Sequence, residues 1–170
     1  LVETCGKPIV GGALDDVVAA YVGGGWCADA AVLDALAVAE KKDDIEAVQA
    51  VIRAVYLPWL EAGALTFQKL VKAGCAAIQS KSPAGISDVA KGTAILFADG
   101  LRFDLAQKLK ARLAEKGLQL ELGWRWTALP TVTPTAKPAA SPISELFTGD
   151  EGCEEFRPRI KDGGKDLTGD

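Results

Sequence analysis

Five polar side chains in the second half of the sequence have types and spacings that suit chemistry on a phosphate. Asp99 offers a carboxylate directly after an apolar run, and Arg102 follows it closely. Thr131, Thr133 and Lys137 lie farther along, in a stretch made almost wholly of Pro, Thr, Ser and Ala. A carboxylate beside hydroxyls and a lysine suits a hard divalent metal ion and a phosphate group. We therefore take Asp99 as a candidate metal ligand, the stretch that holds Thr131 and Thr133 as a candidate nucleophile loop, and Arg102 and Lys137 as candidate phosphate contacts.

Each of these residues also has a plain structural interpretation. Asp99 stands just before a predicted helix and could be its N-cap, because a side-chain oxygen can accept an orphan N–H of the first turn. The Thr- and Pro-rich stretch of residues 130–142 has the composition of an extended linker. Arg102 and Lys137 could be solvated surface charges. The residue types alone do not decide between the roles in a phosphate site and these structural roles.

A strand, a helix and a second strand are expected to bring these side chains together. Residues 93–98 form a nearly all-apolar run, which is typical of a strand buried on both faces. Leucines recur every fourth residue within 101–116, as in an amphipathic helix that stops at Gly117. Apolar and polar residues then alternate over 118–127, which is the period of a strand. This order predicts a parallel βαβ unit whose strands end at one sheet edge, with Asp99 and the threonines beside it.

The composition excludes several kinds of site. The chain has 170 residues, of which 49% are hydrophobic and 25% charged, and this is enough apolar material for a globular core. It contains no histidine, so Ser-His-Asp catalysis, Cys-His catalysis and His-ligated zinc are excluded within this sequence. A net charge of −4 argues against a globally basic surface for nucleic acid. The four cysteines are widely spaced, which favours reduced thiols.

The first half of the sequence is expected to be a helical layer. Residues 1–82 are rich in Ala, Val and Leu that recur at intervals of three and four, and no segment alternates as a strand would. Helices are predicted over 14–22, 29–41, 45–56 and 58–79. The sequence has no methionine and begins with Leu1, so we expect an interior piece of a longer protein. No signal peptide is expected, nor an apolar run of the roughly 20 residues that a membrane span needs.

The segments that carry the candidate residues resemble the PglZ family. The stretch LFADGLRFDLAQKL (96–109), followed by ALPTVTPTAKPA (128–139) and LFTGD (146–150), is similar to the PglZ domain. The upstream AVYLPWLEAGALTFQKLV resembles the helical region that precedes this domain. PglZ proteins belong to the alkaline phosphatase superfamily and include the PglZ component of bacteriophage exclusion (BREX) defence systems.

This resemblance implies a fold class and a division of the chain. The expected fold is α/β, with a helical N-terminal layer followed by an incomplete parallel-sheet domain like that of alkaline phosphatase. The helical region would cover residues 1–82 and a linker residues 83–92. The front part of the PglZ domain, truncated, would cover residues 93–170.

The resemblance also implies roles for the candidate residues. Asp99 matches the superfamily's metal-ligating aspartate after the first strand, and Thr133 matches the family's nucleophile in a PTxT segment, with Thr131 as its neighbour. The implied cofactors of the complete parent are zinc, manganese or magnesium ions. Superfamily members complete a two-metal site with a downstream Asp-His pair and further ligands, whereas this sequence has no histidine. We therefore expect the chain to supply one half-site, to hold no metal securely and to be inactive alone.

Two classes of function follow from this interpretation, and a third follows from the helices alone. The first is the front part of a metal-dependent phosphatase or phosphodiesterase in bacterial phage defence, which would be cytoplasmic and free of membranes. Other defence proteins would be its partners, and a nucleic acid or nucleotide its substrate. The alternative is a non-catalytic scaffold or interaction component of the defence complex with the same fold. The third is a helical interaction module over residues 1–82, whose binding would survive alanine at Asp99 and Thr133.

Overall fold

The structure, a computed structural model, describes residues 1–79, 92, 94, 96, 98, 100–124, 132–141, 143–149, 158–161 and 163. The chain divides into two compact units. The helical unit comprises Leu1–Gly74 and Leu101–Leu122, and the second unit comprises Cys75–Gly100 and Gly123–Asp170. The helix that follows residue 100 in sequence therefore belongs with the N-terminal helices.

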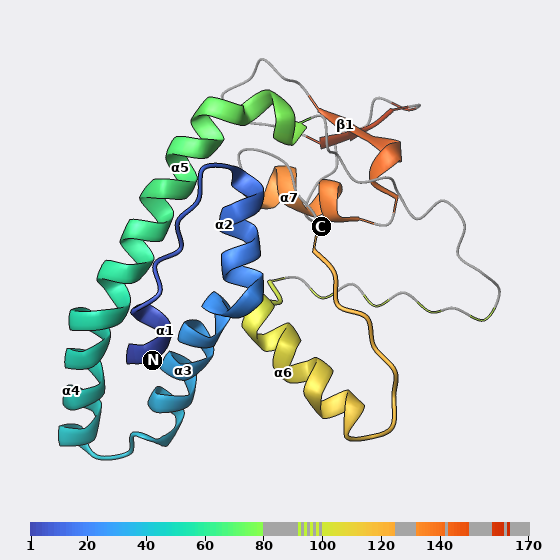
Figure 1. Ribbon diagram of the computed structural model, residues 1–170. Coiled ribbons are helices and arrows are strands. Elements are labelled where there is room, and N and C mark those ends of the chain that lie inside the picture. Colours follow the sequence, from blue (N-terminus) through green and yellow to red (C-terminus); the bar gives the residue numbers. More distant parts are fainter. Residues whose placement is uncertain are drawn as a thin grey trace. The chain divides into compact units, whose positions relative to one another are not determined.

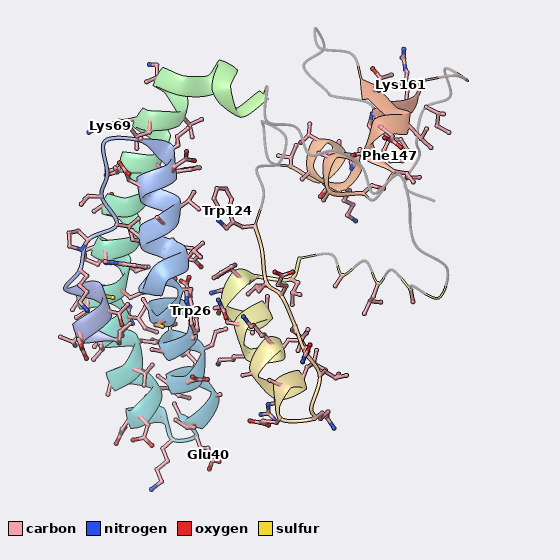
Figure 2. The ribbon with its side chains drawn as sticks, turned by 45° about the vertical axis from the view of Figure 1, so that its right-hand side comes forward. Trp26, Glu40, Lys69, Trp124, Phe147 and Lys161 are labelled. Atoms are coloured by element: carbon pink, nitrogen blue, oxygen red, sulfur yellow. The ribbon has the colours of Figure 1, made fainter. Side chains whose placement is uncertain are left out.

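The helical unit is built from α-helices with two π-helical turns between them. Its elements are α1 (Val2–Cys5), α2 (Leu14–Ala20), η1 (Tyr21–Gly25), α3 (Trp26–Val38), α4 (Lys42–Val51), η2 (Ile52–Tyr56), α5 (Leu57–Gln79), which belongs to this unit as far as Gly74, and α6 (Phe103–Ala114). Figure 1 shows that α2, η1 and α3 follow one another as one bent rod, with α6 beside α3. The end of α3, next to Glu40, turns into α4, and α4 continues through η2 into α5 (Figure 2). The prediction of helices in the first half is confirmed over residues 1–79.

The core of the helical unit contains small side chains and one large side chain, Trp59. Among the described residues, Val17, Ala28, Ala30 and Trp59 are the buried hydrophobic side chains. Alanines at a helix contact let the backbones approach closely, while Trp59 is the largest of these four side chains. Its indole N–H donates a hydrogen bond to the carbonyl of Lys7 at 3.0 Å, which ties the segment after α1 to α5.

The bend between α2 and α3 lies in the glycine triplet of η1. Gly24 has φ 166° and ψ −17°, so the chain leaves helical geometry there for one residue. Gly25 is buried, and a Cβ at this position would lie 3.2 Å from Cδ1 of Ile9 and 3.3 Å from Cδ2 of Tyr21. The close approach of these two side chains is therefore the physical reason for glycine at position 25.

The helix predicted within residues 101–116 is confirmed as α6. Its start rules out the interpretation of Asp99 as the N-cap of this helix. The N-cap of α6 is Arg102, with φ −66° and ψ 152°, so Asp99 is not the cap. The helix ends before Gly117, whose φ of +79° is the left-handed conformation expected of a stop glycine. Along its length α6 packs on α3, and Lys108 forms an ion pair with Asp34.

The predicted α/β architecture with a parallel sheet is wrong. The strands among the described residues are β1 (Phe147–Gly149) and β2 (Pro158–Ile160), and they pair antiparallel, with Thr148 opposite Arg159. Residues 94, 96 and 98 and residues 118–124 form no strand. Leu96 is 92% exposed, which does not fit a strand buried on both faces. Alternating apolar residues give the period of a strand but do not supply the neighbouring chain that its backbone groups must pair with.

The second unit also corrects the interpretation of residues 130–142 as an extended linker. Residues 133–140 of the Thr- and Pro-rich stretch form a helix, α7 (Thr133–Ala140), in which Pro134 stands in the first turn, where no intrahelical N–H bond is lost, and Pro138 lies inside the helix. A short 3₁₀ turn, η3 (Ser144–Leu146), follows α7. Figure 2 labels Phe147 and Lys161 in this unit, and the backbone N–H of Lys161 donates to the carbonyl of Leu146 at 3.0 Å. The tail thus contributes β2.

One segment of the described chain passes a length and composition test for a membrane span. Leu14–Val38 is 25 residues long, with a mean hydropathy of 1.2 and 33% of its apolar window buried. The sequence pattern alone did not single this segment out. A core helix of a soluble protein or a signal sequence passes the same test, so this is one weak candidate.

Candidate functional site

The predicted site residues fall into different parts of the structure. Asp99 and Thr131 lie outside the described residues. Arg102 belongs to the helical unit, as the N-cap of α6. Thr133 and Lys137 are both exposed and lie four residues apart on α7, so their spacing places them on one side of that helix. Of the predicted set, the structure therefore brings together Thr133 and Lys137.

Thr133 and Thr135, both in the first turn of α7, differ in burial and in hydrogen bonding. Thr135 is 4% exposed, and its hydroxyl donates to the carbonyl of Val132 at 3.0 Å. The same oxygen lies 3.3 Å from the backbone N–H of Val132, which donates to it. Thr135 therefore closes the first turn of its own helix. Thr133 is the first residue of α7 and is exposed, so it is the hydroxyl of this pair that a substrate can reach.

Arg102 is held by two carboxylates of the helical unit. Its Nε donates to Oδ1 of Asp104 at 3.0 Å and its Nη2 to Oδ2 of Asp104 at 3.2 Å, a two-pronged pair. Nη2 also lies 3.7 Å from Oδ1 of Asp29. Asp104 is fully buried, whereas the Arg102 side chain is 49% exposed. A phosphate at Arg102 would have to compete with both carboxylates.

Asp29 gathers two tyrosines from distant parts of the sequence. It lies on α3 and is 6% exposed. Tyr21 donates its hydroxyl to Oδ2 of Asp29, and Tyr56 donates to Oδ1, each at 2.5 Å. The Tyr21 ring also packs against Phe103 of α6, with 6.0 Å between ring centroids. We name Tyr21, Asp29, Tyr56, Arg102 and Asp104 the Asp29 cluster.

The π-helical turns place the two tyrosines. Tyr21 is the first residue of η1, and Tyr56 is the last residue of η2. In a straight α-helix, residues eight apart are separated by roughly 12 Å along the axis. The departure from helical geometry at Gly24 bends the rod between Tyr21 and Asp29. Single π-turns of this kind often mark functional or strained positions.

The electrostatics of the cluster keep both tyrosines protonated at neutral pH. Burial, followed by the hydrogen bond to Asp29 and the charge of that carboxylate, raises the pKa of Tyr56 to about 12. The same causes, in the same order, raise the pKa of Tyr21. Burial acts to lower the pKa of Arg102, but its bond to Asp104 and the charges of Asp104 and Asp29 raise it overall. The cluster is therefore a set of donors arranged around two anions.

Most members of the Asp29 cluster were not predicted from the sequence. Asp104 stands in the DGLRFD stretch but was not chosen, and Asp29 is a single carboxylate in the apolar segment WCADAAVL. A lone carboxylate in an apolar helix indicates that a hydrogen-bond or ion-pair partner lies beside it, because burying an unpaired charge costs free energy. Tyr21 and Tyr56 are the two tyrosines of the chain, and nothing in their spacing connects them.

A groove also lies in the helical unit, on the side of η1. Its volume is about 540 Å³, and residues of α1, α2 and η1 line it together with Lys7, Pro8, Ile9 and Cys27. Gly23 and Gly24 border the groove, and a Cβ at either position would meet nothing within 4 Å. The lining mixes Glu3 and Lys7 with apolar side chains, so it offers space without a distinct set of converging polar groups.

The described residues contain no group of three or more His, Cys, Asp or Glu side chains that could hold a metal ion. In the Asp29 cluster the carboxylate oxygens are taken by Tyr21, Tyr56 and Arg102. Asp99 and Thr133 would offer one carboxylate and one hydroxyl, and zinc usually takes three protein ligands even in open catalytic sites. Further ligands would have to join them to complete a metal centre.

Comparison of the chain with protein-family models, with curated proteins and with solved structures finds no match in any of the three.

Proposed function

We propose that the chain is the front part of a PglZ-type, metal-dependent phosphoric-ester hydrolase that acts in cytoplasmic bacterial phage defence. The observation that supports this proposal is that the two carboxylates of the DGLRFD stretch differ in whether the structure gives them a partner. Gly100 has φ +71°, a conformation that favours glycine. Arg102 and Asp104 pair with each other, and Asp104 is fully buried. Asp104 is thus occupied in packing, and Asp99 is the carboxylate of the stretch that we assign to a metal.

The nucleophile is assigned by the same reasoning. Thr135 is committed to the first turn of α7, whereas Thr133 is exposed at its start. Thr133 is therefore the proposed nucleophile, with Thr131 as the alternate and Lys137 as the phosphate contact one helical turn farther on. A bound zinc, manganese or magnesium ion would supply the Lewis acidity that lowers the pKa of a hydroxyl. Further ligands would come from residues beyond this sequence.

Manganese binding to this chain tests the metal ligand. We expect the wild-type chain to bind Mn²⁺ weakly, because one carboxylate and waters hold such an ion loosely. Asp99→Asn should reduce the affinity at least about tenfold, which corresponds to about 1.4 kcal/mol. Asp43→Asn is the matched control, since Asp43 is an exposed aspartate in the first turn of α4. An unchanged affinity for Asp99→Asn would remove Asp99 from the site.

Turnover of a nitrophenyl phosphodiester tests the nucleophile. In a complete hydrolase that contains this chain, Thr133→Ala should abolish turnover with metal content unchanged, because the attacking oxygen is gone. Thr133→Ser keeps a hydroxyl and should retain part of the activity. Full activity of Thr133→Ala would contradict the assignment. So would robust metal-dependent turnover by the present chain alone.

A non-catalytic scaffold is the second candidate, and the exposed leucines of α6 favour it. Leu105 and Leu109 are 37% and 48% exposed and lie four residues apart, whereas Arg102 and Lys108 pair with carboxylates of α3. An apolar stripe on a solvent-facing helix is typical of an interaction surface. Reconstitution of the defence complex distinguishes the two candidates. A scaffold would assemble normally with Asp99→Asn and Thr133→Ala but would lose assembly with Leu105→Glu and Leu109→Glu.

A further inference from the structure

Helix α6 buries a charged side chain and no apolar one. Among its residues the buried one is Asp104, whereas Leu105 and Leu109 are exposed. Phe103 is partly exposed, and its ring contacts that of Tyr21 with 6.0 Å between the centroids. Buried apolar surface is what usually holds one helix on another. Helix α6 is therefore held on the N-terminal helices mainly by charged groups.

Two cations of α6 face two carboxylates of α3. Nη2 of Arg102, the N-cap residue of α6, lies 3.7 Å from Oδ1 of Asp29. Farther along the helix, Lys108 forms an ion pair with Asp34. The Arg102 side chain is half-exposed and that of Asp34 is largely exposed, so water and salt reach both pairs. Because exposed charges are screened by salt, the attraction between the two helices depends on ionic strength.

The Asp29 cluster can be divided without leaving a carboxylate unpaired. Tyr21 and Tyr56 donate to the two oxygens of Asp29, and these three residues lie on η1, η2 and α3. Arg102 and Asp104 pair with each other at the start of α6. At 3.7 Å, the contact between Asp29 and Arg102 is longer than a hydrogen bond. Moving α6 away from α3 would therefore leave each carboxylate with its own donors.

The docking of α6 is also limited by the burial of Asp104. Docking removes this carboxylate from water, at a cost that can equal or exceed the attraction of its partner. Among the described residues, the hydrogen bond that joins α6 to another helix is the one that Lys108 donates to Asp34. A helix of 12 residues is only marginally stable in water by itself. Once detached, α6 would expose its backbone amides to solvent.

We propose that α6 is a strap that separates from α3 when salt screens its ion pairs with Asp29 and Asp34, while the N-terminal helices stay folded. Release uncovers Asp29 on α3 and Phe103 on α6 and leaves α6 free to move. The hydrogen bonds to Asp29 from the two tyrosines remain in place. This inference concerns the helical unit alone and goes beyond the proposed function, because it holds for a hydrolase and for a scaffold alike.

Native-state hydrogen exchange on the whole chain tests the separation. Raising NaCl from about 0.01 M to about 1 M shortens the Debye length from roughly 30 Å to 3 Å. The amides of α6, Ala106 among them, should then exchange at least about fivefold faster, because the helix detaches more often. The amides of α5 around Trp59 should change by less than about twofold, because their helix does not leave.

Two results of this experiment would overturn the strap. Exchange in α6 that is unchanged or slower at high salt would show that apolar contacts hold the helix, since salt does not screen them. Equal acceleration in α6 and α5 would show that α6 opens only together with the rest of the helical unit.

Variants at the two cations test which groups hold α6. Lys108→Gln should speed exchange in α6 at low salt at least about twofold and reduce the response to added NaCl. Arg102→Gln should have the same effects with a larger factor. Lys42→Gln is the matched control, because its exposed pair with Glu46 lies within α4. It should match wild type in α6 exchange and in salt response.

The variants also define the contrary result. If Lys108→Gln and Arg102→Gln both exchange like Lys42→Gln at every salt concentration, the ion pairs do not hold α6 and the proposal is wrong. If Arg102→Gln does not fold, as judged by its helical circular dichroism, Lys108→Gln and the salt series on wild type decide the question.

Discussion

The hydroxyl of Tyr56 donates a hydrogen bond to Oδ1 of Asp29 at 2.5 Å, across 27 residues of sequence. Oδ2 of the same carboxylate accepts from Tyr21. Tyr21 and Tyr56 are the only tyrosines in the chain, so any tyrosine signal from this protein reports on the Asp29 cluster alone. This makes the cluster accessible to simple spectroscopy.

The first prediction concerns alkaline pH. The pKa of Tyr56 is raised to about 12 and that of Tyr21 is also raised, whereas unfolded tyrosine has a pKa of about 10. A raised pKa in the folded state means that the stabilisation is fully present below pH 10 and is lost as the pH rises toward 12. Urea unfolding measured at steps between pH 8 and pH 12 should therefore show falling stability above about pH 10. Tyrosinate absorbance of the folded chain should appear later than that of the urea-unfolded chain.

The double variant Tyr21→Phe and Tyr56→Phe is the control for the loss of stability above about pH 10. Because it has no tyrosine, it should lack the part of the stability loss that comes from these two hydroxyls. An Asp29→Asn chain should ionise its tyrosines earlier than wild type, since the charge that opposes tyrosinate is gone. Tyrosines that ionise at about pH 10 in the folded wild type would show that the two hydrogen bonds do not form.

The second prediction concerns Arg102. Arg102→Gln leaves Asp104 fully buried without its cation, and such a break costs roughly 3–5 kcal/mol in a wholly buried pair. Because the Arg102 side chain is 49% exposed, we expect a smaller loss, about 2–3 kcal/mol in the free energy of unfolding. Lys108→Gln is the comparison, since its pair with Asp34 is largely solvated and should contribute less than about 1 kcal/mol. Equal losses in urea unfolding would contradict the anchoring role of Arg102.

The third prediction concerns the core. Trp59 is 6% exposed and donates to the carbonyl of Lys7, so Trp59→Ala removes both packing and a hydrogen bond. The expected loss in the free energy of unfolding is about 3–5 kcal/mol. Leu65→Ala, on the same helix but 50% exposed, should change stability by less than about 1 kcal/mol. Thermal or urea unfolding measures both, and a Trp59→Ala chain as stable as Leu65→Ala would mean that the core lies elsewhere.

The helices were predictable because their signal is local. Apolar residues at intervals of three and four marked α2, α3, α4 and α5, and a glycine marked the end of α6. The parallel sheet was not predictable in the same way, because a strand needs a partner and the pattern of one segment does not identify it. The leucines of residues 118–122 have the period of a strand, yet Leu118 is 55% exposed and unpaired in any sheet of the described structure.

The candidate site was likewise predictable from the sequence only where its signal is local. The DGLRFD stretch drew attention to Arg102 and also contains its local partner Asp104, but its second partner, Asp29, follows from packing and not from spacing. Asp29 is 73 residues from Arg102 in sequence, and contacts over such a distance depend on the whole fold. The proline-rich composition of residues 130–142 was compatible with an extended linker, whereas residues 133–140 form α7, because composition does not show that a proline falls in the first turn of a helix.

The last prediction concerns the glycine triplet of η1. A methyl group at Gly25 would lie 3.3 Å from Cδ2 of Tyr21, and that ring is fixed by its bond to Asp29 and its contact with Phe103. Because Tyr21 cannot yield without loosening the cluster, Gly25→Ala should lower the free energy of unfolding by about 1–3 kcal/mol, as overpacking does. It should also shift the tyrosinate titration toward that of the unfolded chain.

Gly23→Ala is the matched control two positions away. A Cβ at Gly23 would meet nothing within 4 Å, so this variant should be neutral or should stabilise the chain by up to about 1 kcal/mol through the unfolded state. Its tyrosines should titrate as in wild type. The contrast between the two alanines separates the close packing at Gly25 from a general effect of glycine on helix formation. A Gly25→Ala chain that matches Gly23→Ala in stability and in tyrosine titration would show that η1 does not hold Tyr21 against Asp29.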